Sequence, residues 1–400
     1  MMHSIPFSPP NMTEAEIQAV SEVLRSGWIT TGPKTKEFER RIAAYCGNSK
    51  AVCLNSATAG LELTLRLLGV GPGDEVVTSA YTYTASASAI VHTGATPVLV
   101  DTAKDSFQMD YDKLSAAITP RTKAVIPVDV GGILCDYEKI FAAVEQARGR
   151  FAPANALQEQ MGRAAVVTDA AHSFGAIRGS RRSGHFGDFT VFSFHAVKNL
   201  TTGEGGAVTW RDELGLDGEE LYRQYMLMSL HGQSKDALAK TKLGAWEYDV
   251  VAPLYKCNMT DIMSTIGLAQ LDRYQGMLET RYGLVRLYDR LLAGSPVHPA
   301  RHLWDDERSS CHLYLTRVEG CSSARRSALI EAMAEEGIAA NVHYKPLPLL
   351  TAYRNMGFRA EDYPNAMAQF ENEITLPLYS TLTEEDAQAV CRSLLSHLQD

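Results

Sequence analysis

The sequence predicts an α/β protein whose larger domain is a mainly parallel sheet covered by helices. Short runs rich in Val, Ile and Ala alternate with segments of helical periodicity between residues 51 and 194. That alternation is typical of parallel strands joined by helical crossovers. The chain has 400 residues, which is more than one ordinary core organises, so we also expect a second, smaller domain.

The first helix is expected to begin after Thr13. Thr13 and Glu16 have the spacing of a capping box, and apolar residues follow at helical spacing as far as Leu24. Gly27 then provides a residue that ends helices readily.

Strands and helices should alternate after this helix. Strands are expected at 51–55, 75–78, 97–101, 124–129, 165–169 and 189–194, and helices at 59–68 and 84–92. Asp101, Asp129 and Asp169 each end a strand, where ligands of such sheets bind. Each is therefore a candidate site residue, although an aspartate that caps a helix or turn is the commoner use of this position.

The second half of the chain predicts the small domain. Residues 148–163 are polar and alanine-rich, as in a surface helix extension or loop. A long helical region at 271–292 leads to a strand at 312–316 and a helix at 325–336. We therefore expect a large domain over residues 1–270 and a small domain over 271–400, with about the first 25 residues packing on the small domain.

Composition narrows the class of protein. The net charge of −9 argues against a nucleic-acid binder, which usually has a basic face. The seven cysteines form no CxxC pair, so reduced thiols in a cytoplasmic protein are expected, with no disulfide framework and no metal site. We recognise neither a signal peptide nor a membrane span.

Lys198 and Asp169 are the most informative pair. A lysine that forms a Schiff base and an upstream carboxylate are the minimum equipment for holding pyridoxal phosphate, PLP. Lys198 lies between the apolar run 189–194 and the glycine-rich run 202–206, a poor setting for a surface lysine. Desolvation there would lower its pKa from about 10.4 and free the amine to act as nucleophile and base.

Other residues could hold the rest of such a cofactor. Asn55–Gly60 lies between a strand and a helix, where free N–H groups and the Thr58 hydroxyl suit a phosphate; a simple helix cap is the alternative. Ser193 could add a second hydroxyl. Tyr83 could stack on a flat ring, and His172 lies close to Asp169, although both residue types are often structural.

Together these segments resemble the DegT/DnrJ/EryC1/StrS family, the PLP-dependent nucleotide-sugar aminotransferases. The resemblance covers nearly the whole chain, and its most specific block is Ser193–Asn199 with Gly203–Gly206. The other matching segments include Gly27–Pro33, Asn55–Gly60, Tyr81–Ser86, Asp169–Ala176, Tyr255–Ile262, Asn341–Pro346 and Leu376–Tyr379.

The resemblance implies a PLP enzyme of fold type I, like aspartate aminotransferase. Its large domain would hold a mostly parallel seven-stranded sheet, and its small C-terminal domain would be α/β. It implies a homodimer with active sites at the subunit interface. The implied reaction is ping-pong transamination from an amino acid, L-glutamate, to the keto sugar of a nucleoside-diphosphate sugar. Amination at C-4 of a 4-keto-6-deoxyhexose is the default, and amination at C-3 is the alternative.

The resemblance also implies roles for single residues. Lys198 matches the catalytic Schiff-base lysine and Asp169 the partner of the pyridine nitrogen. The other implied cofactor residues are His172 and Tyr83 at the ring, Ala57, Thr58 and Ser193 at the phosphate, and Asn258 reaching the phosphate of the other subunit's site. His343, Tyr344 and Lys345 match a segment near the sugar nucleotide. Arg178, Arg181 and Arg182 could balance a diphosphate, although the solvated tip of a hairpin is the favoured interpretation of that cluster.

The sequence departs from the family pattern at a few positions. Ala57 stands where glycine is common and Asp129 where histidine is common, while Cys257 and Thr260 replace other frequent residues. We expect the changes at 129, 257 and 260 to bear on substrate choice.

Three other functions are weighed against this one. A sugar dehydratase of the same fold has a histidine in place of the lysine, which Lys198 argues against. A catalytically idle regulator is disfavoured by the joint presence of Lys198, Asp169 and the phosphate residues. A nicotinamide-dependent oxidoreductase would need a GxGxxG motif, which Asn55–Gly60 does not provide.

Overall fold

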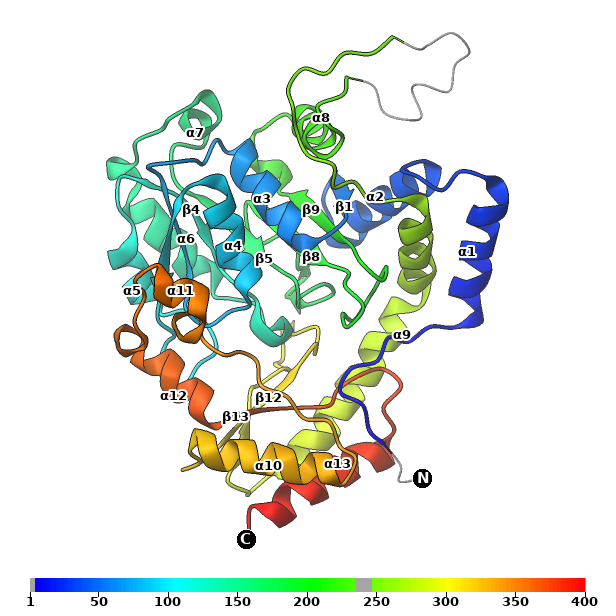
Figure 1. Cartoon of the computed structure of the whole chain (residues 1–400), viewed down its shortest axis with the longest axis vertical. Coiled ribbons are helices and arrows are strands. Elements are labelled where there is room, and N and C mark those ends of the chain that lie inside the picture. The colour runs from blue at the N-terminus through cyan, green and yellow to red at the C-terminus, as the bar shows by residue number, and fades with distance from the viewer. Residues whose placement is uncertain (1–3, 235–246, 400) are drawn as a thin grey trace.

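A seven-stranded sheet organises the larger lobe of the computed structural model, which describes residues 4–234 and 247–399 (Figure 1). Five neighbouring strands are parallel, and β9 runs antiparallel to both of its neighbours, β1 and β8. In spatial order the strands are β1 (Ala51–Leu54), β9 (Gly206–Trp210), β8 (Phe189–Ser193), β5 (Ala165–Asp169), β4 (Thr122–Ile126), β2 (Glu75–Ser79) and β3 (Thr96–Val100). The predicted mostly parallel seven-stranded sheet is confirmed.

Helices cover both faces of this sheet. Successive residues of a strand point to opposite faces, so Val76 packs with Leu61 and Ile90 while Val77 packs with Leu114 and Ile140. The helices of this lobe are α2 (Pro33–Cys46), α3 (Ala57–Leu67), α4 (Thr84–Thr93), α5 (Tyr111–Ala117), α6 (Tyr137–Gln146), α7 (Ala156–Met161) and α8 (Gly218–Ser229).

The first helix follows the sequence closely. Helix α1 spans Glu14–Ser26, and the capping box of Thr13 and Glu16 is formed. Gly27 ends the helix in the left-handed conformation, with φ of 74°. Several elements were not predicted, among them α2, which begins at Pro33, and β9, which the glycine-rich run hides.

The C-terminal lobe is built on a long helix and a second sheet. Helix α9 spans Asp261–Leu292 and so begins earlier than predicted, because the Thr260 side chain accepts a hydrogen bond from the N–H of Met263 and caps it. The antiparallel strands that follow are, in spatial order, β10 (Val297–Pro299), β12 (Tyr314–Val318) and β13 (Glu373–Leu376). The helices are α10 (Ser323–Glu335), α11 (Thr351–Asn355), α12 (Pro364–Asn372) and α13 (Glu384–His397).

The N-terminal segment and α9 connect the two lobes. Ile5 donates a backbone hydrogen bond to Gly337 and accepts one from Ala339, at 2.9 and 3.0 Å, so the segment before α1 lies on the C-terminal lobe. Figure 1 shows α1 beside the upper part of α9, which runs between the lobes. The predicted division at residue 270 falls within α9, and it stays a prediction.

Within the described ranges, no helix has both the length and the apolar character that a membrane crossing requires.

Candidate active site

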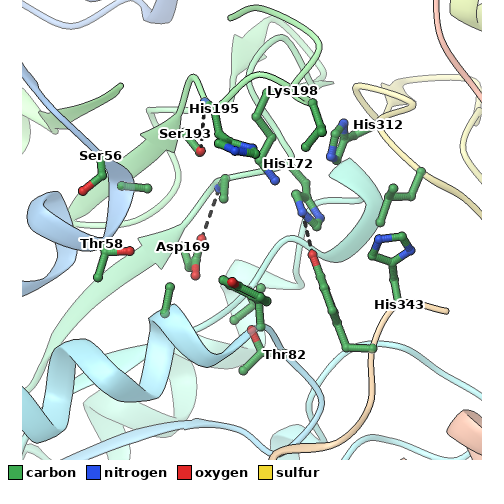
Figure 2. Close-up of a pocket in the computed structure, with 18 of the residues that line it drawn as sticks. Ser56, Thr58, Thr82, Asp169, His172, Ser193, His195, Lys198, His312 and His343 are labelled. Atoms are coloured by element: carbon green, nitrogen blue, oxygen red, sulfur yellow. Dashed lines mark hydrogen bonds between the residues drawn. The ribbon is translucent and has the colours of Figure 1, made fainter. Parts of the chain in front are cut away.

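A cavity of about 500 Å³ lies where the carboxyl ends of the central strands meet the C-terminal lobe. The strand ends contribute Asp169 and Ser193, and the C-terminal lobe contributes His312 and His343 (Figure 2). Tyr344 of the C-terminal lobe lines the cavity as well. The predicted residues that line it are Ala57, Thr58, Tyr83, Asp169, His172, Ser193, Lys198, His343 and Tyr344. Long stretches of sequence thus converge on one space, as expected at this edge of a parallel sheet.

Lys345 and Asn258, to which the resemblance assigns roles in binding, lie outside the lining of this cavity. Lys345 is exposed on the segment that carries His343 and Tyr344. Asn258 is buried, and its side-chain amide donates to Oγ1 of Thr31. The expected role of Asn258 concerns the site of another subunit, so it stays a prediction.

Asp169 is a buried carboxyl held by two donors at the end of β5. Its Oδ2 accepts from Oγ of Ser86 at 2.6 Å, and its Oδ1 accepts from the N–H of Ala171 at 3.1 Å. Burial raises its pKa, while these two hydrogen bonds and the charge of Lys198 oppose that shift. The carboxyl therefore has a fixed orientation and gains stability from a cationic partner.

Lys198 lies on the loop that joins β8 to β9. Backbone hydrogen bonds from Lys198 to His195 and from Thr202 to Phe194, each of 2.9 Å, define this loop. The side chain is partly accessible, and burial lowers its pKa to about 8 although Asp169 favours the charged form. A neutral amine is therefore available near neutral pH, as a nucleophile or proton carrier requires.

The start of α3 forms an anion cradle. The helix begins at Ala57, so the N–H groups of its first turn have no acceptor within the helix, and Ser56 caps only that of Ala59, at 3.1 Å. Figure 2 shows Ser56 and Thr58 on one side of the cavity, with His312 and His343 on the other.

Glycine is required where β9 meets this cradle. A Cβ on Gly206 would lie 2.5 Å from the backbone nitrogen of Ala57. The glycine-rich run therefore lets the strand approach the first turn of α3 closely.

His172 and His312 form a neutral pair beside Lys198. Nδ1 of His172 accepts from the N–H of Gly131 at 3.1 Å, and its Nε2 lies 2.9 Å from Oη of Tyr344. Burial lowers the pKa of both histidines, and the charge of Lys198 lowers them further. Since Nδ1 of the neutral ring is an acceptor, its proton is on Nε2 and points to Tyr344.

Several residues of the lining were not singled out from the sequence. Ser56 could have been identified from the sequence, because a serine directly before a predicted helix is a typical helix cap. His312 lies within the strand predicted at 312–316, but β12 begins only at Tyr314, which leaves His312 facing the cavity. Phe7 reaches the site from the N-terminal segment, and no local pattern marks it.

Two of the strand-terminal aspartates are structural. Asp129 is fully buried and accepts hydrogen bonds from the N–H of Cys135 at 2.9 Å and from Oγ of Ser173 at 2.7 Å, so it holds the loop after β4. Asp101 accepts from the N–H of Ala366 at 2.8 Å, at the start of α12. Of the three strand-terminal candidates, only Asp169 lines the cavity.

The arginine cluster forms a small hairpin. The hairpin consists of β6 (Ile177–Arg178) and β7 (Arg181–Arg182), and Arg178 pairs with Glu307 of β11 (Glu307–Arg308). The hairpin is confirmed, but only Arg181 is exposed, since Arg178 and Arg182 are partly buried and Arg182 lies over the ring of Tyr45. None of the three lines the cavity, so the structure gives no support for them as partners of a diphosphate there.

Nearly the whole length of the chain matches one known protein family. The model of the DegT/DnrJ/EryC1/StrS aminotransferase family matches residues 10–395. The chain belongs to this family. It is 40% identical over 396 residues to the spore coat polysaccharide biosynthesis protein SpsC of Bacillus subtilis, covering 98% of this chain and 96% of that protein.

Solved structures agree in fold. The PMP-form of the putative sugar aminotransferase Spr1654 from Streptococcus pneumoniae has a TM-score of 0.96 and 55% identity, covering 99% of each chain. Helicobacter pylori PseC, an aminotransferase involved in the biosynthesis of pseudoaminic acid, has a TM-score of 0.87 and 27% identity, covering 99% of this chain and 100% of its own. The chain is a PLP-dependent sugar aminotransferase of the aspartate aminotransferase-like fold.

The described residues fit this cofactor. The anion cradle at α3 suits its phosphate, the carboxyl of Asp169 suits a protonated pyridine nitrogen, and the amine of Lys198 suits its aldehyde. All three groups line one cavity.

Proposed function

We propose that this enzyme moves an amino group from L-glutamate to the keto sugar of a nucleoside-diphosphate sugar by a ping-pong reaction. The observation that carries this proposal is the meeting of Lys198, Asp169 and the anion cradle in one cavity whose opposite wall is uncharged and polar. We place the reaction at C-4 of a 4-keto-6-deoxyhexose, which rests on the family resemblance.

The large lobe supplies the residues for the chemistry. When bound, the cofactor provides an electron sink for the reacting carbon. Asp169, held by Ser86 and Ala171, would keep the pyridine nitrogen protonated. Lys198 would attach the cofactor and, once displaced, carry a proton on Nζ to and from the reacting carbon, for which a pKa of about 8 is suitable.

The C-terminal lobe would bind the sugar. His343 and Tyr344 project hydrogen-bonding groups into the cavity, and burial lowers the pKa of His343 to about 3, so its ring is neutral. Neutral groups recognise hydroxyl, carbonyl and amide groups without attracting a competing anion to the reaction centre. Lys345, which is exposed on the same segment, would meet the diphosphate.

We also propose that two copies assemble with the cavity at their interface. Two residues that line the cavity, Tyr83 and Val197, are 61% and 40% exposed in the single chain, and Val251 and Tyr255 are exposed apolar side chains as well. Covering this apolar surface would stabilise a dimer and bring Asn258 to the partner's phosphate cradle. Measurement of the molecular mass in solution tests this assembly.

All seven cysteines are free, which supports a cytoplasmic location.

A two-step assay tests the reaction. Purified enzyme loaded with PLP should convert L-glutamate to 2-oxoglutarate once for each site, and the amino form should then convert a nucleoside-diphosphate 4-keto-6-deoxyhexose to an amino sugar. NMR of the product distinguishes C-4 from C-3 amination. Completion of the first step, with no keto-sugar nucleotide accepted in the second, would contradict the proposed acceptor.

A further inference from the structure

Glu373 is a fully buried carboxyl directly behind the sugar-binding wall. It begins β13, and Thr375, two residues on, shares its face of the strand. Oε2 of Glu373 accepts from the backbone N–H of His343 at 2.8 Å, and its Oε1 accepts from Oγ1 of Thr375. Oγ1 of Thr375 in turn lies 2.9 Å from Nδ1 of His343. Glu373 and His343 are thus joined both directly and through Thr375.

The single hydroxyl proton of Thr375 couples the two ends of this chain. When Thr375 donates to an ionised Glu373, its oxygen must accept from His343, so the proton of the neutral ring is on Nδ1 and Nε2 is an acceptor. When Glu373 is protonated and donates to Thr375, the hydroxyl donates to Nδ1, and the ring proton moves to Nε2. Both arrangements satisfy every group, so the state of Glu373 selects between them.

The orientation of the His343 ring is fixed by its neighbours in both arrangements. Phe7 stacks on it with centroids 5.4 Å apart and planes inclined by 22°. The hydroxyl of Tyr81 donates to the backbone carbonyl of His343 at 2.9 Å. A change in Glu373 is therefore expressed as a change of tautomer rather than as a rotation of the ring.

We propose that Glu373 is a positioning residue which, through Thr375, sets the tautomer of His343 and so decides whether this residue offers the keto sugar a hydrogen-bond acceptor or a donor. With Glu373 ionised, Nε2 of His343 accepts a hydroxyl or amide N–H of the sugar. Tyr344 complements it, because its oxygen accepts from Nε2–H of His172 and its own proton is free to donate. That the ligand is a keto sugar rests on the proposed function. The control of the His343 tautomer by Glu373 does not depend on that function.

The surroundings of Glu373 bring its ionisation into an experimentally accessible pH range. Burial raises its pKa to about 8, and the charge of Arg326 on α10 opposes the shift. Tyr81 and Tyr344, which also interact with Glu373, have pKa values raised by burial and stay neutral in that range. The charge of Lys198, whose own pKa is lowered to about 8, also acts on His343, and Lys198 is unchanged in every variant below. His343 is neutral as well, since its pKa is lowered to about 3.

The ¹⁵N NMR spectrum of the PLP-loaded enzyme with labelled histidine tests the tautomer without any sugar. His343→Gln assigns the resonances by their loss. We expect the proton to move between Nδ1 and Nε2 as the pH crosses 8 in the wild type and in Thr375→Ser, which keeps the hydroxyl. Glu373→Gln should hold it on Nε2 at every pH, because the amide donates to Thr375, and Thr375→Val should abolish the exchange. An unchanged tautomer across these variants would overturn the proposal.

The second half-reaction gives an independent measurement. Above pH 8, Glu373→Gln should raise the KM for the keto-sugar nucleotide about tenfold, the value of one hydrogen bond, with little change in the glutamate half-reaction. Below pH 8 the ratio of the two KM values should approach one. Equal ratios at both pH values would overturn the assigned role. Failure of transamination with a normal tautomer exchange would count against the proposed function alone.

Discussion

The two walls of the cavity differ in charge and in how the chain builds them. The wall from the large lobe carries a pair of opposite charge, Asp169 at the end of β5 and Lys198 on the loop that follows the neighbouring strand β8. The wall from the C-terminal lobe carries His343 and Tyr344, which are neutral and depend on buried groups behind them. One wall is therefore equipped for cofactor chemistry and the other for recognition, so variants on the two sides should fail in different ways.

The largest effect is expected at Lys198. Lys198→Ala removes both the amine that attaches the cofactor and the proton carrier, so the glutamate half-reaction should slow by about 10³-fold or more. Stopped-flow absorbance of PLP-loaded protein measures this. Lys104→Ala, a change at an exposed lysine after β3, should retain the wild-type rate. A comparable loss in both variants would show that folding, and not the amine, is affected.

The next effect separates the strand-terminal aspartates. Asp169→Asn keeps the size of the side chain but loses its charge, so the half-reaction should slow on the order of a hundredfold while the phosphate cradle still holds the cofactor. Asp101→Asn should leave the rate unchanged, because Asp101 caps α12 instead. The rate and the PLP dissociation constant of each variant test this, and a wild-type rate in Asp169→Asn would refute the role of the charge.

The sequence revealed these two walls unequally. Lys198, Asp169 and the cradle lie in continuous motifs beside predictable strands, and α1 was readable from its cap. The role of Glu373 was not predictable, because its contact with His343 joins segments 30 residues apart and depends on the antiparallel bridge between Asn341 and Thr375 of β13. Strand β9 was hidden because it begins with Gly206, which allows close packing against the start of α3, a tertiary reason that local propensity does not express.

The pH dependence of stability tests the buried carboxyl behind the wall from the C-terminal lobe. The pKa of Glu373 is raised from 4.5 to about 8 in the folded chain, so between these values the unfolded chain loses the proton first and stability falls as the pH rises. Glu373→Gln should flatten this decline by up to about 1.4 kcal/mol for each pH unit. Glu331→Gln, at an exposed position on α10, should keep the wild-type slope. Urea denaturation across this pH range measures the free energy of unfolding. Equal slopes against pH in the wild type and in Glu373→Gln would contradict the raised pKa of Glu373.

The smallest effect concerns the packing behind the phosphate cradle. Gly206→Ala would place a Cβ 2.5 Å from the backbone nitrogen of Ala57, so we expect a loss of about 1–3 kcal/mol in stability and weaker PLP binding. Gly276→Ala, in open space on α9, should be neutral or stabilising by up to about 1 kcal/mol. Thermal unfolding and PLP titration test both, and tight PLP binding by Gly206→Ala would show that the cradle tolerates displacement.

The most direct test of the proposed function is the visible absorption spectrum of the purified protein, recorded before and after adding L-glutamate and then a keto-sugar nucleotide. We expect an absorption band of cofactor joined covalently to Lys198. L-glutamate should convert this band to that of the amino form, and the keto sugar should restore it. Lys198→Ala can still bind PLP in the phosphate cradle but should lack the band of the covalent attachment. A band unmoved by L-glutamate would contradict the assigned donor. Failure of the protein to take up cofactor after incubation with PLP would contradict its assignment as a PLP-dependent aminotransferase. That result would favour a catalytically idle member of the family.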